Sequence, residues 1–366
     1  MSFGARALIR LGALSHNYSV IKKTAPEAAI MAVVKANAYG HGLTDVASAL
    51  PDVDSFAVAR LAEARALRAS GILQPIVILS GVYSDEDLRT ACASGCELVV
   101  HCSAQIEQLE AHPELRAIVW LKLDTGMNRL GFPIEKGAQL IARLNTCPAV
   151  AELRLMTHLA NAHDTDDSMT DIQLRKFAVI ASTFQGDISI ANSGGIFGWP
   201  LSIRPDYLPA TSRVWVRPGI ALYGISPYPN RNGSDLGLRP VLQFESRLIA
   251  VKPVARGDRV GYGGTWIAER DTTLGIIAAG YGDGYTRYLP AGTPVLINDR
   301  LAGLAGVISM DLAAVDLGPA AKDRVGDIVV LWGDAIPVEE VARRAKALSY
   351  HLICGVTNRE ASSVVE

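Results

Sequence analysis

The chain has 366 residues, and because domains usually span about 100–200 residues, this length predicts two domains rather than one. Hydrophobic residues make up 49% of the chain and charged residues 20%, a balance that argues against a disordered or fibrous protein. Lys and Arg number 35 against 37 Asp and Glu, so the net charge of −2 offers no global positive field and nucleic acid is not an expected partner.

Targeting and metal signals are absent from the sequence. No apolar run approaches the roughly 18 residues of a membrane span, and the N-terminal segment lacks the apolar core of a secretory signal. We therefore expect a cytoplasmic protein without a membrane partner. The five cysteines lack the C-x2-C pairing of zinc sites, so we expect buried, reduced side chains and no metal site at Cys92, Cys96, Cys102, Cys147 and Cys354.

The first two thirds of the chain alternate between short apolar runs and segments of helical pattern. Helical spacing predicts helices such as Leu61–Ser70, Asp85–Ala93 and Asp171–Phe184. Strand and helix repeated about eight times over about 200 residues are typical of a closed (β/α)8 TIM-type barrel, and an open doubly wound sheet is the alternative. The eight predicted strands are Ala29–Val34, Ser55–Ala59, Pro75–Leu79, Glu97–His101, Ala117–Leu123, Glu152–Thr157, Asp187–Ala191 and Val214–Val216.

After about Gly237 the pattern changes to short strands separated by turns, which predicts a C-terminal mostly-β domain. Only Val338–Ala347 has a helical pattern there. We place the domains at 1–236 and 237–366, after the Pro-, Gly- and Asn-rich segment Pro227–Gly237, with the first few residues able to pack on the β domain. The predicted strands are Leu242–Val251, Thr273–Ala278, Thr293–Ile297, Ala302–Ile308, Leu312–Asp316 and Asp327–Leu331.

Polar residues follow five of the predicted barrel strands. Because the loops after parallel barrel strands converge on one mouth, we expect these side chains to face one another. They are Lys35 after the first strand, Lys122 and Asp124 at the fifth with Arg129 beyond, His158 after the sixth, Asn192 and Ser193 after the seventh, and Arg217 after the eighth.

Lys35 is the candidate reactive residue of this set. A lysine at a strand end is usually a surface residue, but a desolvated amine of lowered pKa can condense with an aldehyde cofactor. Ala191–Gly195 (ANSGG) and Arg217–Ile220 (RPGI) follow the strands whose loops commonly bind phosphate in barrel enzymes, although each is also compatible with a tight turn. A reactive lysine opposite a phosphate cradle points to pyridoxal phosphate.

A pyridoxal phosphate cofactor suggests chemical roles for two further residues. Arg217 does not give up its proton, so beside the pyridine nitrogen it would leave the ring unprotonated and a weak electron sink. A structural ion pair with a carboxylate is the alternative for Arg217. Tyr262, in a glycine-rich loop of the second domain, carries an ionisable hydroxyl that could act as acid or base.

The segment Ala32–Gly42 (AVVKANAYGHG) resembles the pyridoxal-phosphate attachment motif of alanine racemases. Any single motif has little specificity, but the set spans nearly the whole chain in order and together is highly specific. The resemblance continues through Lys122–Phe132 (KLDTGMNRLGF), Met156–Ala162 (MTHLANA), Ala191–Gly195, Val216–Gly224 (VRPGIALYG), Val260–Trp266 (VGYGGTW), Gly280–Tyr285 (GYGDGY) and Ser309–Leu312 (SMDL).

The resemblance implies a racemase that interconverts L- and D-alanine through a pyridoxal-phosphate Schiff base on Lys35. By the same resemblance, Lys35 is the base for the D-isomer and Tyr262 the opposing base for the L-isomer. Arg217 would meet the pyridine nitrogen, supported by His158. The implied cofactor-binding residues are Lys35, Tyr39, His158, Asn192, Ser193, Arg217, Gly219, Ile220 and Tyr350.

The resemblance also assigns substrate contacts and a partner. Arg129 and Met310 would contact the substrate carboxylate, and Lys122 matches a lysine that many members carry as a carbamate bracing Arg129. Tyr281 and Tyr350 resemble residues of an entrance constriction. The family forms a head-to-tail homodimer in which the equivalents of Tyr262 and Met310 reach the partner's site. One departure is Asn161-Ala162-His163-Asp164, where the family usually has Asp directly after the Ala.

The sequence motifs are also compatible, to different degrees, with other functions. A serine or broad-specificity racemase would share the same motifs, and the resemblance does not decide whether D-alanine is made for peptidoglycan or degraded. A decarboxylase of similar plan fits the motifs less well. A non-catalytic pyridoxal-phosphate-binding protein would lack the second domain, and a metal-dependent barrel hydrolase would need histidine pairs that the sequence lacks.

Overall fold

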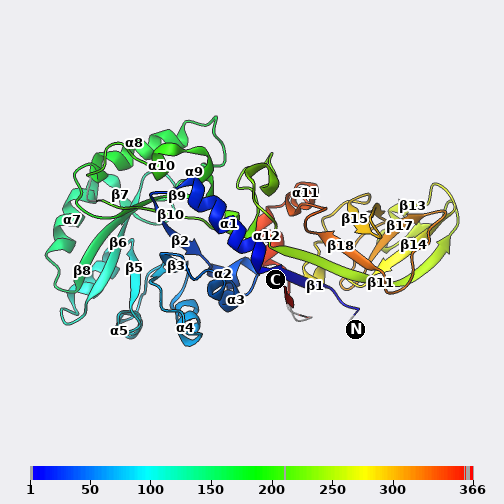
Figure 1. Cartoon of the computed structure of the whole chain (residues 1–366), viewed down its shortest axis with the longest axis horizontal. Coiled ribbons are helices and arrows are strands. Elements are labelled where there is room, and N and C mark those ends of the chain that lie inside the picture. The colour runs from blue at the N-terminus through cyan, green and yellow to red at the C-terminus, as the bar shows by residue number, and fades with distance from the viewer. Residues whose placement is uncertain (1–2, 210–211, 358, 360–362, 366) are drawn as a thin grey trace.

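Eight parallel strands close into a barrel in the larger lobe of the molecule (Figure 1). The computed structural model describes residues 3–209, 212–357, 359 and 363–365. The ring closes because β10 pairs with β2 and β5 pairs with β6, which confirms the predicted barrel and excludes the open doubly wound sheet. The strands are β2 (Ala29–Val33), β3 (Ser55–Val58), β4 (Ile76–Ile78), β5 (Cys96–Val100), β6 (Ala117–Asp124), β8 (Val150–Met156), β9 (Ile188–Asn192) and β10 (Val214–Arg217).

The barrel strands read as continuous apolar runs because both of their faces are buried. Every residue of β2 and of β5 is buried, as parallel strands covered by helices require. The covering helices turn small or apolar residues such as Ala64 and Leu67 toward the sheet. These helices are α1 (Leu11–Thr24), α3 (Leu43–Ser48), α4 (Leu61–Ala69), α5 (Asp85–Ala93), α6 (Ser103–Glu110), α7 (Gly137–Asn145), α8 (Met169–Ala181), α9 (Ser193–Gly198) and α10 (Pro200–Ile203).

A charged and aromatic layer fills the barrel interior below the mouth. The Arg154 guanidinium lies over the rings of Trp120 and Trp215, 5.3 and 5.4 Å from their centroids. Trp120 donates to the Glu97 carboxylate at 2.6 Å, and Arg154 donates to the same carboxylate at 3.1 Å. Because residues two apart on a strand share a face, this layer lies directly beneath Lys122 and Arg217 and closes the floor of the mouth.

The smaller lobe is built on a curled, mostly antiparallel sheet. β11 (Leu242–Val254) pairs with both β14 and β18, and the N-terminal strand β1 (Arg6–Arg10) pairs with β11 (Figure 1). The remaining elements are β12 (Arg259–Val260), β13 (Trp266–Ile267), β14 (Thr272–Ile277), β15 (Pro294–Ile297), β16 (Arg300–Leu304), β17 (Ala313–Gly318), β18 (Ile328–Trp332) and β19 (Ser363–Val365), with β7 (Phe132–Pro133) beside β6 in the barrel.

The smaller lobe contains a helix that the sequence pattern did not predict. Val338–Ala347 is not the only helical segment of the smaller lobe, since α11 (Val338–Arg344) is followed by α12 (Ser349–Cys354). A six-residue helix is too short for its periodicity to stand out. A second short element, α2 (Lys35–Tyr39), directly follows β2. Both elements border the barrel mouth.

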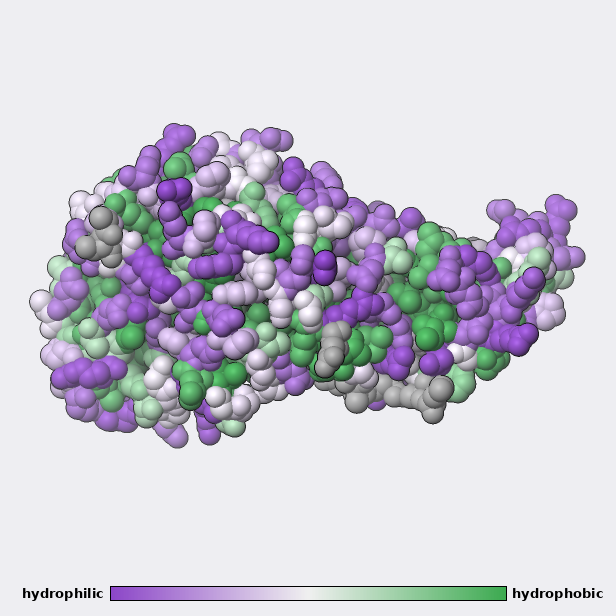
Figure 2. Space-filling view, viewed as in Figure 1, coloured by the Kyte–Doolittle hydropathy of each residue, from purple (hydrophilic) through white to green (hydrophobic). Residues whose placement is uncertain are grey.

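The cysteines differ in their burial. Cys354 is exposed and Cys92 and Cys102 are half-buried, so the expectation of buried cysteines holds only for Cys96 and Cys147. Among the described residues, no helix has the length and apolar character needed to cross a membrane. The domain boundary at residues 236 and 237 stays a prediction. Figure 2 shows the broad barrel lobe and the narrower second lobe, on which apolar residues reach the surface.

Candidate functional site

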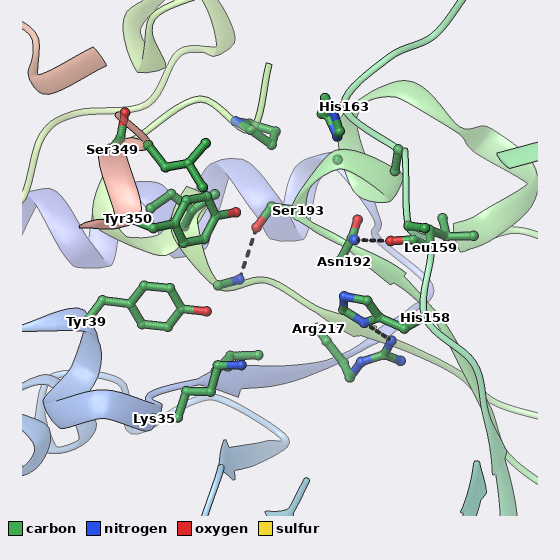
Figure 3. Close-up of a pocket in the computed structure, with 18 of the residues that line it drawn as sticks. Lys35, Tyr39, His158, Leu159, His163, Asn192, Ser193, Arg217, Ser349 and Tyr350 are labelled. Carbon is green, nitrogen blue, oxygen red and sulfur yellow. Dashed lines mark hydrogen bonds between the residues drawn. The ribbon is translucent and has the colours of Figure 1, made fainter. Parts of the chain in front are cut away.

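A cavity of about 770 Å³ opens at the carboxyl ends of the barrel strands. It brings together most of the residues singled out from the sequence, and Figure 3 shows several of them around one common space. The second lobe contributes α11 and α12 to its wall. The predicted site residues that line it are Lys35, Tyr39, Lys122, Arg129, His158, Asn192, Ser193, Arg217, Gly219, Ile220 and Tyr350.

Lys35 enters the cavity at the start of an unusual backbone segment. The four residues Ala36 to Tyr39 all have positive φ between 52° and 55°, which makes α2 a left-handed turn. Such a conformation costs L-residues about 1–2 kcal/mol each, so surrounding contacts must hold it. Burial lowers the pKa of Lys35, and the charge of Arg129 lowers it further, while Glu63 acts in the opposite direction. A lowered pKa leaves more of the amine in its neutral form near neutral pH, and the neutral amine is the form that acts as nucleophile and accepts a proton.

The left-handed turn is seated against the second lobe. A side chain on Gly40, which ends the turn with φ of +86°, would meet the carbonyl oxygen of Ile353 in α12 at 2.3 Å. The ring of Tyr39 lies 4.8 Å from that of Tyr223 and 5.9 Å from that of Tyr350. Lys35 and Tyr39 from the barrel are therefore positioned together with Tyr350 from α12.

Ser193 and Gly219 form a small cradle on one side of the cavity. The Ser193 hydroxyl accepts a hydrogen bond from the amide of Gly219 at 3.0 Å (Figure 3). It also accepts one from the amide of Ala221 at 3.3 Å. A side chain on Gly219 would come within 2.6 Å of the Tyr39 hydroxyl, so only glycine leaves this space open. The hydroxyls of Tyr39 and Tyr350 have no hydrogen-bond partner among the described residues. Free hydroxyl donors around a glycine backbone suit an anion such as phosphate.

Arg217 is buried at the base of the cavity and makes no ion pair in the described part of the chain. Its guanidinium donates to the hydroxyl of Ser189 at 2.5 Å, to the carbonyl of Thr157 at 2.7 Å and to Nδ1 of His158 at 3.3 Å. Burial lowers its pKa to about 10, so it stays charged at neutral pH. Burial and the charge of Arg217 hold the pKa of His158 far below its usual range, which keeps His158 neutral and able to accept. The alternative of a structural ion pair for Arg217 is therefore wrong.

Lys122 adds a second buried cationic group to the mouth, beside Arg217 and the half-buried Lys35. It is 8% exposed and has neither a hydrogen bond nor an ion pair with any residue that the structure describes. Burial, followed by the charges of Arg217 and Arg129, lowers its pKa to about 7. Asp124 is the carboxylate that opposes this shift, and its own Oδ1 accepts from the amide of Gly126. The mouth is thus rich in buried cationic groups and poor in anions.

Three residues that the sequence analysis missed support the site from behind. Ser189 accepts from Arg217 and donates to the carbonyl of Trp215 at 2.7 Å. Gln173 of α8 accepts from the amide of Ala160 at 2.8 Å and donates to the carbonyl of His158 at 2.9 Å. Glu63 of α4 accepts from the amide of Ala36 at 2.7 Å. All three lie within ordinary strand or helix patterns, and no sequence signal separated them from neighbouring polar residues.

Three predicted site residues lie outside the cavity. Tyr262, in the turn η4 (Tyr262–Gly264) between β12 and β13, is 68% exposed, Met310 is 55% exposed and Tyr281 is 40% exposed. The loops of Tyr281 and Met310 are joined because the amide of Gly282 donates to the Met310 carbonyl at 2.8 Å. Within one chain these residues belong to the surface of the second lobe, and not to the barrel mouth.

No group of three or more metal-binding side chains gathers among the described residues.

Comparison with known proteins shows the family to which the chain belongs. Residues 9–227 match the family model described as "Alanine racemase, N-terminal domain", and residues 241–364 match "Alanine racemase, C-terminal domain". The chain belongs to the alanine racemase family.

Individual relatives agree with this assignment. An alanine racemase of Vibrio parahaemolyticus is 47% identical over 357 residues, covering 97% of each chain, and that of Vibrio cholerae is 47% identical over 97% of this chain and 96% of its own. The solved structure of the biosynthetic alanine racemase from Pseudomonas aeruginosa is 40% identical, with a TM-score of 0.93 and full coverage of both chains. As a member of this family, the chain is an enzyme of the isomerase class.

The shifted pKa of Lys122 gives a stability prediction. Between pH 7 and 10.5 the unfolded chain keeps a proton on Lys122 that the folded chain has lost, so this residue makes stability rise with pH across that window. We expect Lys122→Met to raise the unfolding midpoint by about 2–4 °C at pH 7 and by much less at pH 10. Thermal unfolding in CO₂-free buffer measures both values. The exposed Lys136→Met is the control, and an equal effect of Lys122→Met at both pH values would contradict the assignment.

Proposed function

We propose that the chain interconverts L- and D-alanine with pyridoxal phosphate bound in the barrel mouth. The observation that carries the proposal is the set of buried cationic groups without carboxylate partners, arranged opposite the cradle of Ser193 and Gly219. Buried charges require compensation, and an anionic cofactor together with a carboxylate substrate would supply it. Membership of the alanine racemase family supports alanine as the substrate.

The residues present fit this cofactor. The space kept open by Gly219, the unpartnered hydroxyls of Tyr39 and Tyr350, and the hydroxyl of Ser193 suit a phosphate group. The remaining phosphate contact would come from Ile220, with Asn192 fixing the loop through its bond to the carbonyl of Leu159 at 3.1 Å. When bound, pyridoxal phosphate condenses with amines through its aldehyde and acidifies the Cα proton of the attached amino acid.

Lys35 would hold the cofactor through its amine and, once released by the substrate amine, accept or return a proton on one face of Cα. Its lowered pKa favours both roles, since the neutral amine is the reactive form. Arg217 would face the pyridine nitrogen. Because it stays protonated at neutral pH, it holds that position as a donor without giving up its proton. His158 accepts from Arg217 and restrains its orientation.

The proposed second base, Tyr262, lies outside the barrel mouth of its own chain. Tyr262 and Met310 are exposed on the second lobe, so we propose that they reach the cavity of a second copy of this chain in a head-to-tail homodimer. Tyr262 would then serve the face of Cα opposite Lys35, as base for the L-isomer. Burial of these apolar and aromatic surfaces would also favour the dimer. Tyr281, on the same surface, would form the entrance constriction with Tyr350.

Arg129 would bind the substrate carboxylate by a forked pair of hydrogen bonds. Lys122, with a pKa of about 7, is partly neutral at physiological pH and can therefore react with carbon dioxide. We propose that it carries a carbamate, which would turn a buried cation into an anion beside Arg129.

The proposed domains are residues 1–236 and 237–366. Production of D-alanine for cell-wall peptidoglycan is the proposed role.

We expect Lys35→Ala to abolish both racemisation and the visible absorption of the bound cofactor, because no other cavity amine occupies its position. Borohydride reduction of the parent protein, digestion and mass spectrometry should place the cofactor on the peptide that contains Lys35. Lys322→Ala, which removes an exposed lysine of the second lobe, is the control. Reduction products on another lysine, or none at all, would refute the proposed function.

We expect Tyr262→Phe to slow deuterium exchange at Cα of L-alanine by about 10²–10⁴-fold, the usual contribution of a positioned base. Exchange from D-alanine, which depends on Lys35, should fall far less. Mass spectrometry of each isomer after incubation with the variant in D₂O measures the two rates. Equal and mild losses for both isomers would remove Tyr262 from the mechanism.

Co-expression of two inactive variants tests the shared site. In a hybrid of Lys35→Ala and Tyr262→Phe chains, one of the two sites combines an intact lysine with the partner's intact tyrosine. Half of randomly paired dimers are hybrids, so we expect about a quarter of the parent's activity per chain. Co-expression of Lys35→Ala with the double variant should recover none. If both pairs stay inactive although hybrids are isolated, each site uses its own Tyr262.

A further inference from the structure

The backbone immediately after Lys35 is held in a conformation that its residues do not favour. Ala36, Asn37, Ala38 and Tyr39 carry side chains, yet all four lie in the left-handed region. None of them is glycine, so the turn depends on contacts made by other parts of the chain. The contacts that hold this turn also determine where the Lys35 side chain points, because the turn begins at Lys35 itself.

The distal end of the turn is fastened by the loop that follows it. The side chain of Asn37 accepts from the amide of Leu43 at 2.9 Å, and the amide of Gly42 donates to the Asn37 carbonyl at 3.1 Å. Gly40 then packs closely on Ile353 of α12. These contacts hold the segment from Asn37 to the glycine loop, and none of them involves Ala36, the residue directly after Lys35.

The proximal end is fastened by one side chain, Glu63, the third residue of α4. One carboxylate oxygen accepts from the amide of Ala36 at 2.7 Å. The other accepts from the amides of Ala59 at 2.8 Å and Arg60 at 3.1 Å, where β3 ends and α4 begins. Glu63 therefore links the residue that follows Lys35 to the first turn of the neighbouring helix. A carboxylate can accept on both oxygens at once, and a carboxamide cannot.

We infer that Glu63 is a positioning residue for Lys35: its carboxylate fixes the start of the left-handed turn and thereby aims the lysine amine into the cavity. The inference rests on the proposed function only for what Lys35 does there, because the three hydrogen bonds of Glu63 stand independently of it. Nothing in an amphipathic helix pattern marks Glu63, whose capping position alone would explain only the bond from the Arg60 amide.

The charge of Glu63 adds a second effect at the same place. The groups that act on the Lys35 charge are Arg129 and Arg217, which oppose it, and Glu63 and the Cys354 thiol, which favour it. Glu63 is thus the carboxylate that partly offsets two cations around the amine. Removing its charge while keeping its shape should make the Lys35 nitrogen less basic.

Hydrogen exchange at the Ala36 amide tests the geometry. In Glu63→Gln the side chain cannot accept on both sides, and in Glu63→Ala it accepts on neither, so we expect Ala36 exchange to become about tenfold faster in the purified holoenzyme. Asp87→Asn is the matched control: Asp87 occupies the third position of the next barrel helix, α5, and its carboxylate has no hydrogen bond with a described residue. Unchanged Ala36 protection in Glu63→Ala would overturn the inference.

Spectroscopy and kinetics then separate positioning from general destabilisation. We expect the pH at which the visible cofactor absorbance titrates to fall in Glu63→Gln and to stay near the parent's value in Glu63→Asp, which keeps the charge but is too short to span both bonds. We expect kcat to fall about tenfold with KM for alanine changed less than twofold. An equal loss in Asp87→Asn would overturn the inference. A parent protein that neither absorbs with pyridoxal phosphate nor racemises alanine would instead refute the proposed function, while Ala36 exchange would still report on Glu63.

Discussion

Buried positive charge at the barrel mouth is the constraint on which the rest of the structure depends. Arg217 and Lys122 are nearly inaccessible, and Lys35 is half-buried beside them. None of them has an ion pair with a described residue, and the acceptors of Arg217 are a hydroxyl, backbone carbonyls and a neutral imidazole. A fold that leaves such groups uncompensated gives up stability, since a cation in a dry site is costly without a partner. This loss of stability is expected at a site whose ligand is an anion, because the bound ligand compensates the buried charges.

The barrel architecture makes this concentration of charge possible. The floor layer of Glu97, Trp120, Arg154 and Trp215 closes the interior below the mouth and pairs its own charges internally. The compensated layer and the uncompensated layer are separated by only two residues along β6, from Trp120 to Lys122, and along β10, from Trp215 to Arg217. Charge in the floor is therefore structural, whereas charge at the mouth, two residues further along the same strands, is left available for a ligand.

The eight barrel strands and the polar residues at their ends were predictable because they follow from local pattern, whereas Tyr39 and Tyr350 were assigned only through the family resemblance. An apolar run that ends in a polar residue locates both the strand and its mouth-facing end, as for Arg217 and Lys122. The supporting residues were not predictable in this way. Ser189, Gln173 and Glu63 act through contacts between elements distant in sequence, and their own positions look ordinary. The left-handed turn at Ala36 to Tyr39 was also not predictable from the sequence. Residues other than glycine adopt this conformation only where tertiary contacts stabilise it.

The division of the site between two lobes follows from the chemistry that we propose. Lys35, Arg217 and the cradle of Ser193 all arise from barrel strand ends, so they approach a bound ligand from the same side. A reaction that removes a proton from one face of Cα and returns it to the other is served by two bases on opposite sides, and the proposed second base, Tyr262, does not line the cavity of its own chain. Tyr262 stands on an exposed turn of the second lobe, where its hydroxyl is free to enter another molecule. In the proposed dimer, this exposed turn of the second lobe would complete the partner's cavity on the side opposite Lys35.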